Sequence, residues 1–162
     1  MQAAYDTTTQ EYVEVIRDLE REFKVARVKD IAERRGVSRS SVSIALNQLV
    51  KKELITHEQY GHISLTPAGQ ELAQDLERKH QAIKKFLTSI LGISEPVADK
   101  DACTLEHHMS NETLDRLSDF VEFVEKCPHK LKEIIVLYRD CIQLFPKKID
   151  CETCVETDEG SR

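Results

Sequence analysis

A thiol, a carboxylate and two imidazoles lie within six residues of one another in the stretch CTLEHH, residues 103–108. If this stretch is helical, residues three and four apart share a face, so Cys103, Glu106 and His107 would point the same way. His108 would turn aside by about 100°, to pack or to support the site. Sulfur, oxygen and nitrogen donors on one face predict a metal site. A half-buried helix that happens to carry a histidine is the alternative.

A metal ion needs more ligands than this stretch supplies, and two other predicted helices offer donors. His80 lies in ERKHQAIKKFL, within a helix predicted over 67–91. Glu11 and Glu14 share one face of the first predicted helix. One ion bound by all of these residues would join two separate parts of the chain, as a metal-operated switch requires. Each donor alone is also explained without a metal, with the glutamates on a solvated helix face and His80 on the surface.

The first part of the chain is predicted to form a helix-turn-helix followed by a β-hairpin. Asp6 or Thr7 can cap a first helix, and Gly36 can end a short second one. Ser38 is a natural N-cap for a third helix. Apolar and polar residues then alternate over residues 53–69, which predicts two paired strands. This order of elements is typical of a winged helix-turn-helix.

The third predicted helix has side chains suited to the major groove of DNA. Its first turn carries hydroxyls and one guanidinium, which can reach phosphates and base edges, and its N-terminus favours phosphate. Residues 31–52 carry five basic side chains and one acidic, although the net charge of the chain is −6. A serine-rich cap on an ordinary helix is the alternative. The predicted DNA-contacting residues are Arg27, Ser38, Arg39, Ser40, Ser41, Ser43, Asn47, Lys51, Tyr60 and His62.

The rest of the chain is predicted to be helical, with a helix over 67–91, another over about 100–109 and two more beyond it. The predicted fold class is therefore mainly α. It comprises a winged helix-turn-helix DNA-binding domain with a small β-hairpin wing over 1–70, an all-helical domain over 71–145, and a polar tail with cysteines over 146–162.

The composition is that of an ordinary globular protein, with 162 residues, 40% hydrophobic and 32% charged. No run of 18 apolar residues predicts a membrane span, and the acidic N-terminus does not read as a signal peptide. We therefore expect a cytoplasmic protein with reduced cysteines. The sequence has no nucleophile elbow, phosphate-binding glycine loop or HExxH motif, so we expect that it is not an enzyme.

Five stretches resemble, in unbroken order, the diphtheria toxin repressor family of metal-dependent transcriptional regulators, which includes the manganese transport regulators. They cover roughly residues 5–125. The resemblance implies a homodimer that binds a double-stranded DNA operator when loaded with Fe(II) or Mn(II) and represses metal-uptake genes. It also implies that the helical domain serves dimerisation and metal binding. The stretches are TTTQEYVEVIRDLE, VKDIAERRGVSRSSVSIALNQLVKKELI, ISLTPAGQELA, RKHQAIKKFL and ACTLEHHMSNETLDRL.

Carried over by position, the ligands of that family fall on Glu11, Glu14, His80, Cys103, Glu106 and His107. Cys103 resembles the iron-type members, whereas Glu14 resembles the manganese type. Lys84 stands where the ancillary site of the iron types has a carboxylate, so a binuclear site that uses Glu14 is favoured. A thiolate ligand favours iron, cobalt, nickel or zinc over manganese. Because iron is the more available of these, we predict Fe(II), with Mn(II) close behind.

Four further cysteines fall outside this ligand set. The spacing of Cys151 and Cys154 is typical of zinc, iron–sulfur or redox sites, and Cys127 and Cys141 could complete a set of four thiolates. The alternative function is therefore a winged-helix regulator that senses redox state, an iron–sulfur cluster or Zn(II) through these residues. The alternative is that these cysteines bind nothing, with Cys141 a small buried residue and Cys127 a helix-end residue.

Overall fold

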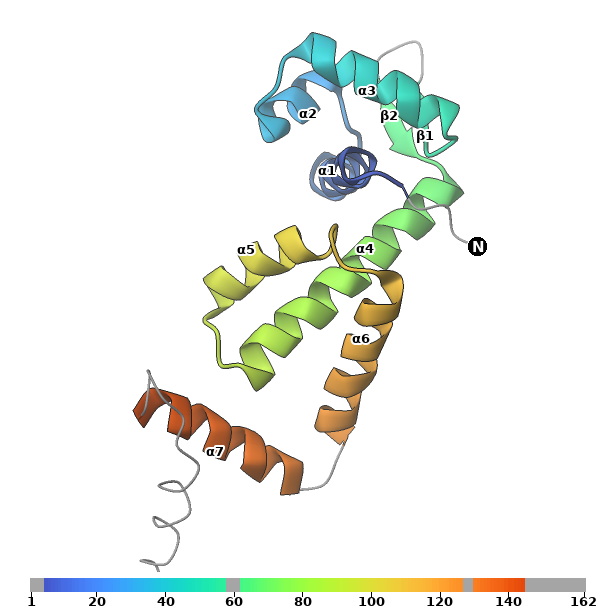
Figure 1. The fold of residues 1–162 in the computed structure, drawn as a ribbon. Coiled ribbons are helices and arrows are strands. Elements are labelled where there is room, and N and C mark those ends of the chain that lie inside the picture. The colour runs from blue at the N-terminus through green and yellow to red at the C-terminus, as the bar shows by residue number, and fades with distance from the viewer. Residues whose placement is uncertain (1–4, 58–61, 127–129, 145–162) are drawn as a thin grey trace, which may run out of the picture. The chain divides into compact units, whose positions relative to one another are not determined.

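The computed structural model describes residues 5–57, 62–126 and 130–144 and divides the chain into two compact units (Figure 1). The first unit comprises Met1–His80 and Thr104–His108, and the second comprises Gln81–Cys103 and Met109–Arg162. The domain boundary predicted at residue 70 falls inside one continuous helix, α4 (Pro67–Lys85). That boundary and the separate tail stay predictions, since most of the tail lies outside the described residues.

The first unit is a helix-turn-helix followed by an antiparallel hairpin, as predicted (Figure 1). In the hairpin, Ile55 pairs with Leu65 and His57 pairs with Ile63. Ala26 forms an isolated bridge to Ile63, which ties the hairpin to the chain just before the second helix. The elements are α1 (Thr7–Phe23), α2 (Val28–Arg35), α3 (Arg39–Lys51), β1 (Ile55–His57) and β2 (Ile63–Leu65).

The predicted cap residues explain where these helices begin and end. The N–H of Thr9 donates to the Asp6 carboxylate at 2.9 Å, and the N–H of Ser41 donates to the Ser38 hydroxyl at 3.1 Å. Both bonds satisfy donors that have no partner within the helix. Gly36 ends α2 with a φ of 64°, which a residue without a Cβ adopts without strain. A turn of three residues therefore separates α2 from α3.

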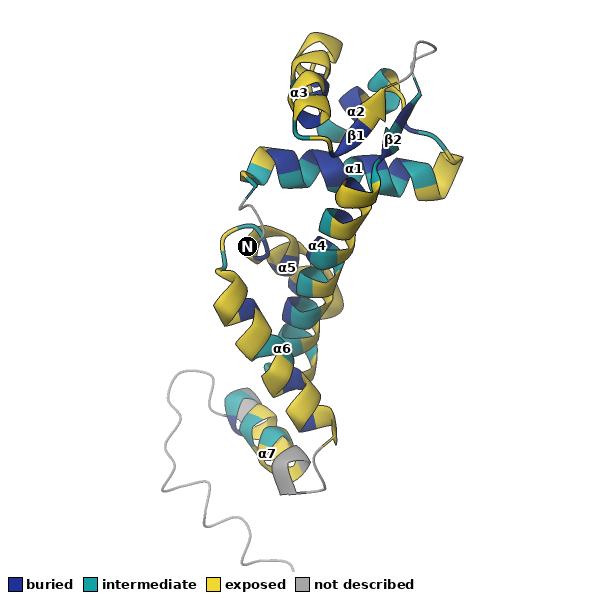
Figure 2. Ribbon diagram, turned by 90° about the vertical axis from the view of Figure 1, so that its right-hand side faces the viewer, coloured by how far each residue is buried: buried dark blue, intermediate teal, exposed yellow. Residues whose placement is uncertain are grey.

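One hydrophobic core holds the first unit together. It is built from apolar side chains of α1, α2, α3 and the hairpin, and each fully buried aliphatic side chain contributes about 1.5–3 kcal/mol. Figure 2 shows the alternation of buried and partly buried residues along α1 and the largely exposed outer face of α3. The largest fully buried side chains are Ile16, Leu19, Ile31, Leu46, Leu49, Leu54 and Ile63.

The second unit contains helices only in its described part. Its small core is formed by Ile83, Ala102 and Leu114. The helix predicted over 67–91 changes at Lys85 into a π-helical turn. Among the described residues, none of the helices combines the length and apolar character needed to span a membrane. The elements after α4 are η1 (Phe86–Ile90), α5 (Glu95–Leu105), α6 (Asn111–Lys126) and α7 (Lys130–Leu144).

The helix predicted over about 100–109 was misplaced at both ends. α5 ends at Leu105, and residues 106–108 form a turn that the N–H of His108 closes on the Leu105 carbonyl at 3.0 Å. Cys103, Glu106 and His107 therefore do not share one helical face. The physical reason is that the N–H of His108 bonds to the carbonyl three residues back instead of four, which closes a tighter turn and ends the α-helical pattern. The chain must also reverse before Ser110, whose hydroxyl accepts from the N–H of Thr113 at the start of α6.

Gly69 should be intolerant of a side chain although it lies in a helix. Replacing glycine by alanine in a helix normally stabilises a protein by about 0.5–1 kcal/mol. A Cβ at Gly69 would lie 2.1 Å from the carbonyl oxygen of Leu54. We therefore expect Gly69→Ala to destabilise the protein, by about 1–3 kcal/mol in urea unfolding. The exposed neighbour Gln70→Ala should stay within about 0.5 kcal/mol of wild type, and a Gly69→Ala protein as stable as this control would contradict the packing.

Candidate metal centre and DNA-binding surface

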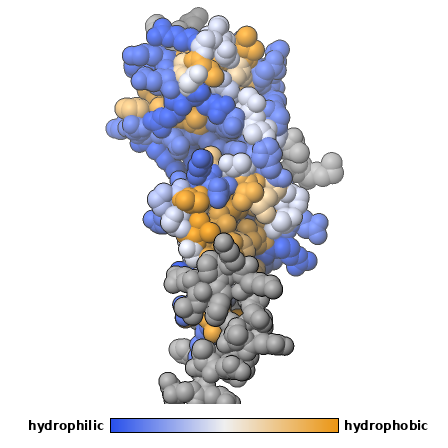
Figure 3. Space-filling view, turned by 60° about the vertical axis from the view of Figure 1, so that its left-hand side comes forward, coloured by the Kyte–Doolittle hydropathy of each residue, from blue (hydrophilic) through white to orange (hydrophobic). Residues whose placement is uncertain are grey.

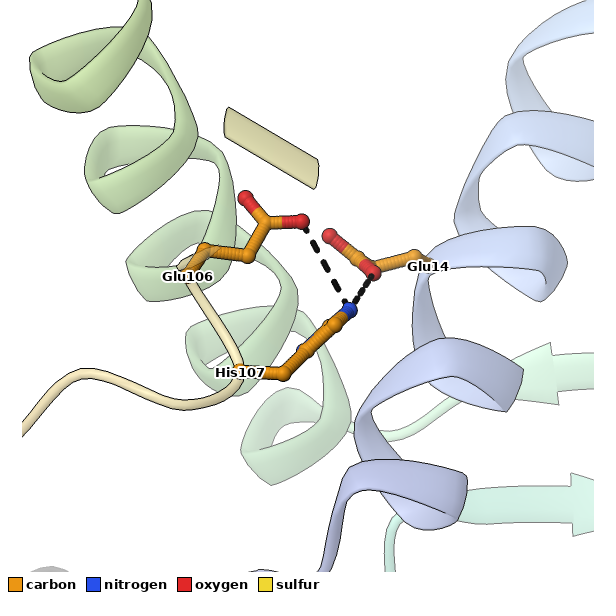
Figure 4. A group of neighbouring side chains, drawn as sticks. All are labelled: Glu14, Glu106 and His107. Atoms are coloured by element: carbon orange, nitrogen blue, oxygen red, sulfur yellow. Dashed lines mark ion pairs between the residues drawn. The ribbon is translucent and has the colours of Figure 1, made fainter. Parts of the chain in front are cut away.

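Three of the predicted ligands lie together in the first unit. Glu14 comes from α1, and Glu106 and His107 come from the turn after α5 (Figure 4). One donor atom from each residue lies within 4.8 Å of the others. Nε2 of His107 is 3.5 Å from Oε2 of Glu14 and 3.6 Å from Oε1 of Glu106. The three donor atoms therefore lie close enough together for one ion to contact all of them.

His80 of α4 adds a second imidazole beside this group. Its Nδ1 lies 3.1 Å from Oε2 of Glu106, the oxygen that does not face His107. The Glu106 carboxylate thus lies between two histidines. Because the side chain of Glu106 is only 1% exposed, the two imidazoles are close polar neighbours for a group that water scarcely reaches.

Burial changes the protonation of the cluster. It raises the pKa of the Glu14 carboxyl from 4.5 to about 7, against the opposing effect of the Arg17 guanidinium. Burial likewise lowers the pKa of His107, against the opposing charge of Glu11. The neutral imidazole is the form that binds metals. Two carboxylates that are costly to keep ionised and a neutral imidazole together favour a divalent cation.

The donor types of the cluster fit the expected metals. Carboxylate oxygens suit Mn(II), and imidazole suits iron and zinc as well. A thiolate is absent from the group of Glu14, Glu106 and His107 that the described residues form. This core alone therefore does not separate Mn(II) from Fe(II).

Three other predicted ligands are placed differently. Glu11 is not part of the group, because its carboxylate pairs with the Arg35 guanidinium at 2.6 Å. Arg35 also lies over the ring of Tyr12, 5.2 Å from its centroid. Cys103 is exposed and belongs to the second unit. The ligand roles of all six residues stay predictions. His108 is exposed, which contradicts the expectation that it packs, and its alternative role in supporting the site stays a prediction.

The predicted DNA-binding residues lie mainly on the outer face of α3 and its N-cap, and the ones there are all exposed. The Ser38 hydroxyl hydrogen-bonds to those of Ser40 and Ser41 at 2.7 and 2.9 Å, and the Ser43 hydroxyl donates to the Arg39 carbonyl. These bonds hold small polar groups around the N-terminus of α3. Asn47, Lys51 and Arg27 are also exposed, whereas His62 is half-buried and Tyr60 lies outside the described residues.

Sequence reasoning missed two residues that the structure brings forward. Gln10 lies against His107, and it could have been found from its position one helical turn before Glu14. Ile44 is 66% exposed on α3, among the polar residues expected to meet DNA. The sequence could have indicated this residue, because Ile44 is apolar but does not belong to the buried stripe of Val42, Leu46 and Leu49.

The further cysteines are largely outside the described residues. Cys127, Cys151 and Cys154 lie there, so a second metal or cluster site with Zn(II) or iron–sulfur stays a prediction. Cys141 is described, and its side chain is buried in α7. That burial agrees with the alternative in which Cys141 is a small buried residue of the helical unit and binds nothing.

Two family models match the chain in succession. The N-terminal DNA binding domain of the iron dependent repressor matches residues 5–63, and the iron dependent repressor metal binding and dimerisation domain matches residues 66–134. Transcriptional regulator MntR of Escherichia coli O157:H7 is 41% identical over 112 residues, which are 69% of this chain and 72% of that protein. The chain belongs to the iron-dependent repressor family. It is therefore a metal-dependent transcriptional regulator, and the resemblance inferred from its motifs is confirmed.

Other members of the iron-dependent repressor family support the same fold. HTH-type transcriptional regulator MntR of Geobacillus kaustophilus is 34% identical over 125 residues, 77% of this chain and 88% of that protein. The crystal structure of IdeR from T. acidophilum matches with a TM-score of 0.64 at 29% identity, and the manganese regulator SloR with 0.60 at 34%. The matches cover 77% and 75% of this chain but only 58% and 56% of those structures. The predicted fold class is confirmed.

The raised pKa of Glu14 predicts a specific dependence of stability on pH. In the metal-free protein the folded state should hold a proton on Glu14 up to about pH 7, whereas the unfolded chain releases it near 4.5. The contribution of Glu14 to stability is therefore present below pH 4.5 and is lost as the pH rises through about 7. Mn(II) must displace this proton, so its affinity should rise over the same interval.

The matched variant for this prediction is Glu14→Gln, which keeps the shape of the side chain and cannot ionise. Urea unfolding at several pH values should show wild type losing stability relative to Glu14→Gln between pH 4.5 and 7, by roughly 3 kcal/mol in all. A constant difference between the two proteins would show that Glu14 titrates normally.

Proposed function

We propose that this chain represses metal-uptake genes by binding a double-stranded DNA operator as a homodimer when Fe(II) or Mn(II) occupies the cluster of Glu14, Glu106 and His107. The observation that carries the proposal is that cluster, in which two buried carboxylates and an imidazole converge within 4.8 Å. It lies in the same compact unit as the helix-turn-helix. The similarity to the manganese regulator SloR supports a metal-responsive role.

The link between metal and DNA runs through α1 in this proposal. Glu14 lies on α1, whose buried residues Val13, Ile16 and Leu19 share one core with Leu46 and Leu49 of α3. A bound ion supplies the positive charge that offsets the buried carboxylates. Glu14 then holds α1 to the turn after α5, and the shared core passes this constraint to α3. Moving such an equilibrium from mostly off to mostly on needs differential binding of about 5.5 kcal/mol.

Arg35 is the second point of connection. It holds Glu11 by an ion pair, and it is the last residue of α2, directly before the turn to α3. If Glu11 is a ligand, it must leave Arg35 when the ion binds. The metal ion would then compete with the Arg35 guanidinium for the Glu11 carboxylate. This competition would couple the metal site to the helix-turn-helix.

Dimerisation is proposed to cover apolar side chains of the second unit. Figure 3 shows hydrophobic side chains gathered on one face of the molecule. Phe120 and Phe123 of α6 are 42% and 58% exposed, although they are large aromatic groups. Such exposure marks an interaction surface in a protein of this size, and the matched model for residues 66–134 is that of a dimerisation domain.

Cys103 decides the metal in this proposal, because a thiolate added to the cluster favours Fe(II) over Mn(II). An operator selected from random DNA would be titrated by fluorescence anisotropy under anaerobic conditions with Fe(II), Mn(II) or Zn(II). We expect Fe(II) to activate wild type most strongly, Cys103→Ala to lose Fe(II) activation preferentially, and Cys103→Glu to prefer Mn(II). Full activation by Mn(II) with none by Fe(II), or an unchanged metal order in Cys103→Ala, would contradict the role of the thiolate.

Ile44 is proposed to contact the methyl group of a thymine, since its exposed side chain lies among polar residues on the groove-facing side of α3. Ile44→Ala should weaken binding to the selected operator about fourfold, because burying one methyl contributes about 0.8 kcal/mol. Replacing the contacted thymine by uracil should cause a similar loss in wild type and none in Ile44→Ala. Val50→Ala, also on an exposed position of α3, is the control. Equal sensitivity of both variants to uracil would refute the contact.

A further inference from the structure

Gln10 connects the N-terminal segment to the imidazole of the metal cluster. Its amide nitrogen Nε2 donates to the carbonyl oxygen of Tyr5 at 2.7 Å. Its amide oxygen Oε1 lies 2.9 Å from Nδ1 of His107. All three residues belong to the first unit, and Gln10 itself is half-buried on α1. An amide is not among the ligands expected for the ion, so these contacts need a separate explanation.

The orientation of the Gln10 amide follows from what each atom can do. The Tyr5 carbonyl can only accept a hydrogen bond, so the atom that faces it must be the amide nitrogen of Gln10. The amide oxygen is thereby directed to His107. Because that oxygen also only accepts, Nδ1 of His107 must carry the hydrogen. In a neutral imidazole, Nε2 then holds the lone pair.

This tautomer places the lone pair where the carboxylates converge. Nε2 of His107 is the nitrogen that lies 3.5 Å from Glu14 and 3.6 Å from Glu106. Once Glu14 loses its proton, this nitrogen and the two carboxylates all present lone pairs that one cation can accept. A histidine that binds a metal commonly donates its other N–H to an oxygen acceptor, which fixes both ring orientation and tautomer.

The anchor of Gln10 is itself held in place. The Lys52 ammonium lies 6.0 Å from the centroid of the Tyr5 ring and pairs with the Asp6 carboxylate at 2.7 Å. Lys52 is the C-cap residue of α3. The Tyr5 carbonyl is therefore part of a segment fastened to the end of α3, which gives the Gln10 amide a fixed partner.

We propose that Gln10 is a positioning residue that holds His107 in its Nδ1–H tautomer and so presents Nε2 to the metal ion. The inference rests on the proposed function, because it assumes that His107 is a ligand. It goes beyond that function because it assigns to Gln10 the role of fixing the tautomer of His107 before an ion binds.

The test measures the tautomer in metal-free protein and the metal affinity separately. Long-range ¹H–¹⁵N NMR of ring-labelled histidine, with His107→Gln for assignment, reports which nitrogen of His107 bears the hydrogen. Calorimetry with Mn(II) gives the affinity. The variants are Gln10→Leu, which removes the acceptor, and Gln10→Glu, which keeps an oxygen acceptor. Gln70→Leu, at an exposed position of α4, is the matched control.

We expect wild type, Gln10→Glu and Gln70→Leu to carry the hydrogen on Nδ1. Gln10→Leu should show a mixture of tautomers and bind Mn(II) about 10–100-fold more weakly, as is usual when the outer partner of a ligating histidine is lost. Gln10→Glu should bind at least as tightly as wild type.

The inference is overturned if wild type carries the hydrogen on Nε2, or if Gln10→Leu keeps both the tautomer and the affinity. If Gln10→Leu does not fold, the tautomer of wild type and the affinity of Gln10→Glu still decide. A wild type that shows the Nδ1–H tautomer but does not bind Mn(II) or Fe(II) would refute the proposed function and leave the positioning of His107 intact.

Discussion

The buried carboxylate of Glu106 is the constraint on which the rest of the site depends. The residue is 3% exposed, and an ionised carboxylate at such a place is expensive unless charged or hydrogen-bonding partners surround it. His80 and His107 face its two oxygens, and Glu14 adds a second acid on the far side of the His107 ring nitrogen. A divalent cation can take the place of the proton on Glu14 and offset both carboxylates, which favours a metal site over ordinary packing.

Local signals in the sequence account for the part of the fold that could be predicted. The caps at Asp6, Ser38 and Gly36 and the alternation around the hairpin are local signals, so the helix-turn-helix and its wing were predicted correctly. The end of α5 was not predicted correctly, and the turn at 106–108 brings Glu106 and His107 to Glu14 of α1. The hydrophobic periodicity of one segment gives no information about its contacts with a distant helix.

Contacts between distant residues set the other limit. Glu14 was expected at the site from its helical position and from family resemblance, and it is there. Glu11 had the same two arguments in its favour, but Arg35, 24 residues away in the sequence, holds its carboxylate. Gln10 meets His107 across 97 residues, and only the folded chain reveals that pairing. Residue type and spacing therefore predicted donors for a metal ion, whereas the fold decided which of these donors meet.

Removal of one charge from the centre of the cluster tests the account most directly. Glu106→Gln keeps the size of the side chain and an amide oxygen beside the histidines, but it removes the negative charge that an ion would offset. The account predicts that operator binding by this variant, measured by fluorescence anisotropy with and without Fe(II) or Mn(II), no longer responds to metal while its helix content stays that of wild type. A folded Glu106→Gln protein whose operator binding still rises with metal as in wild type would contradict the assignment of this cluster as the metal switch.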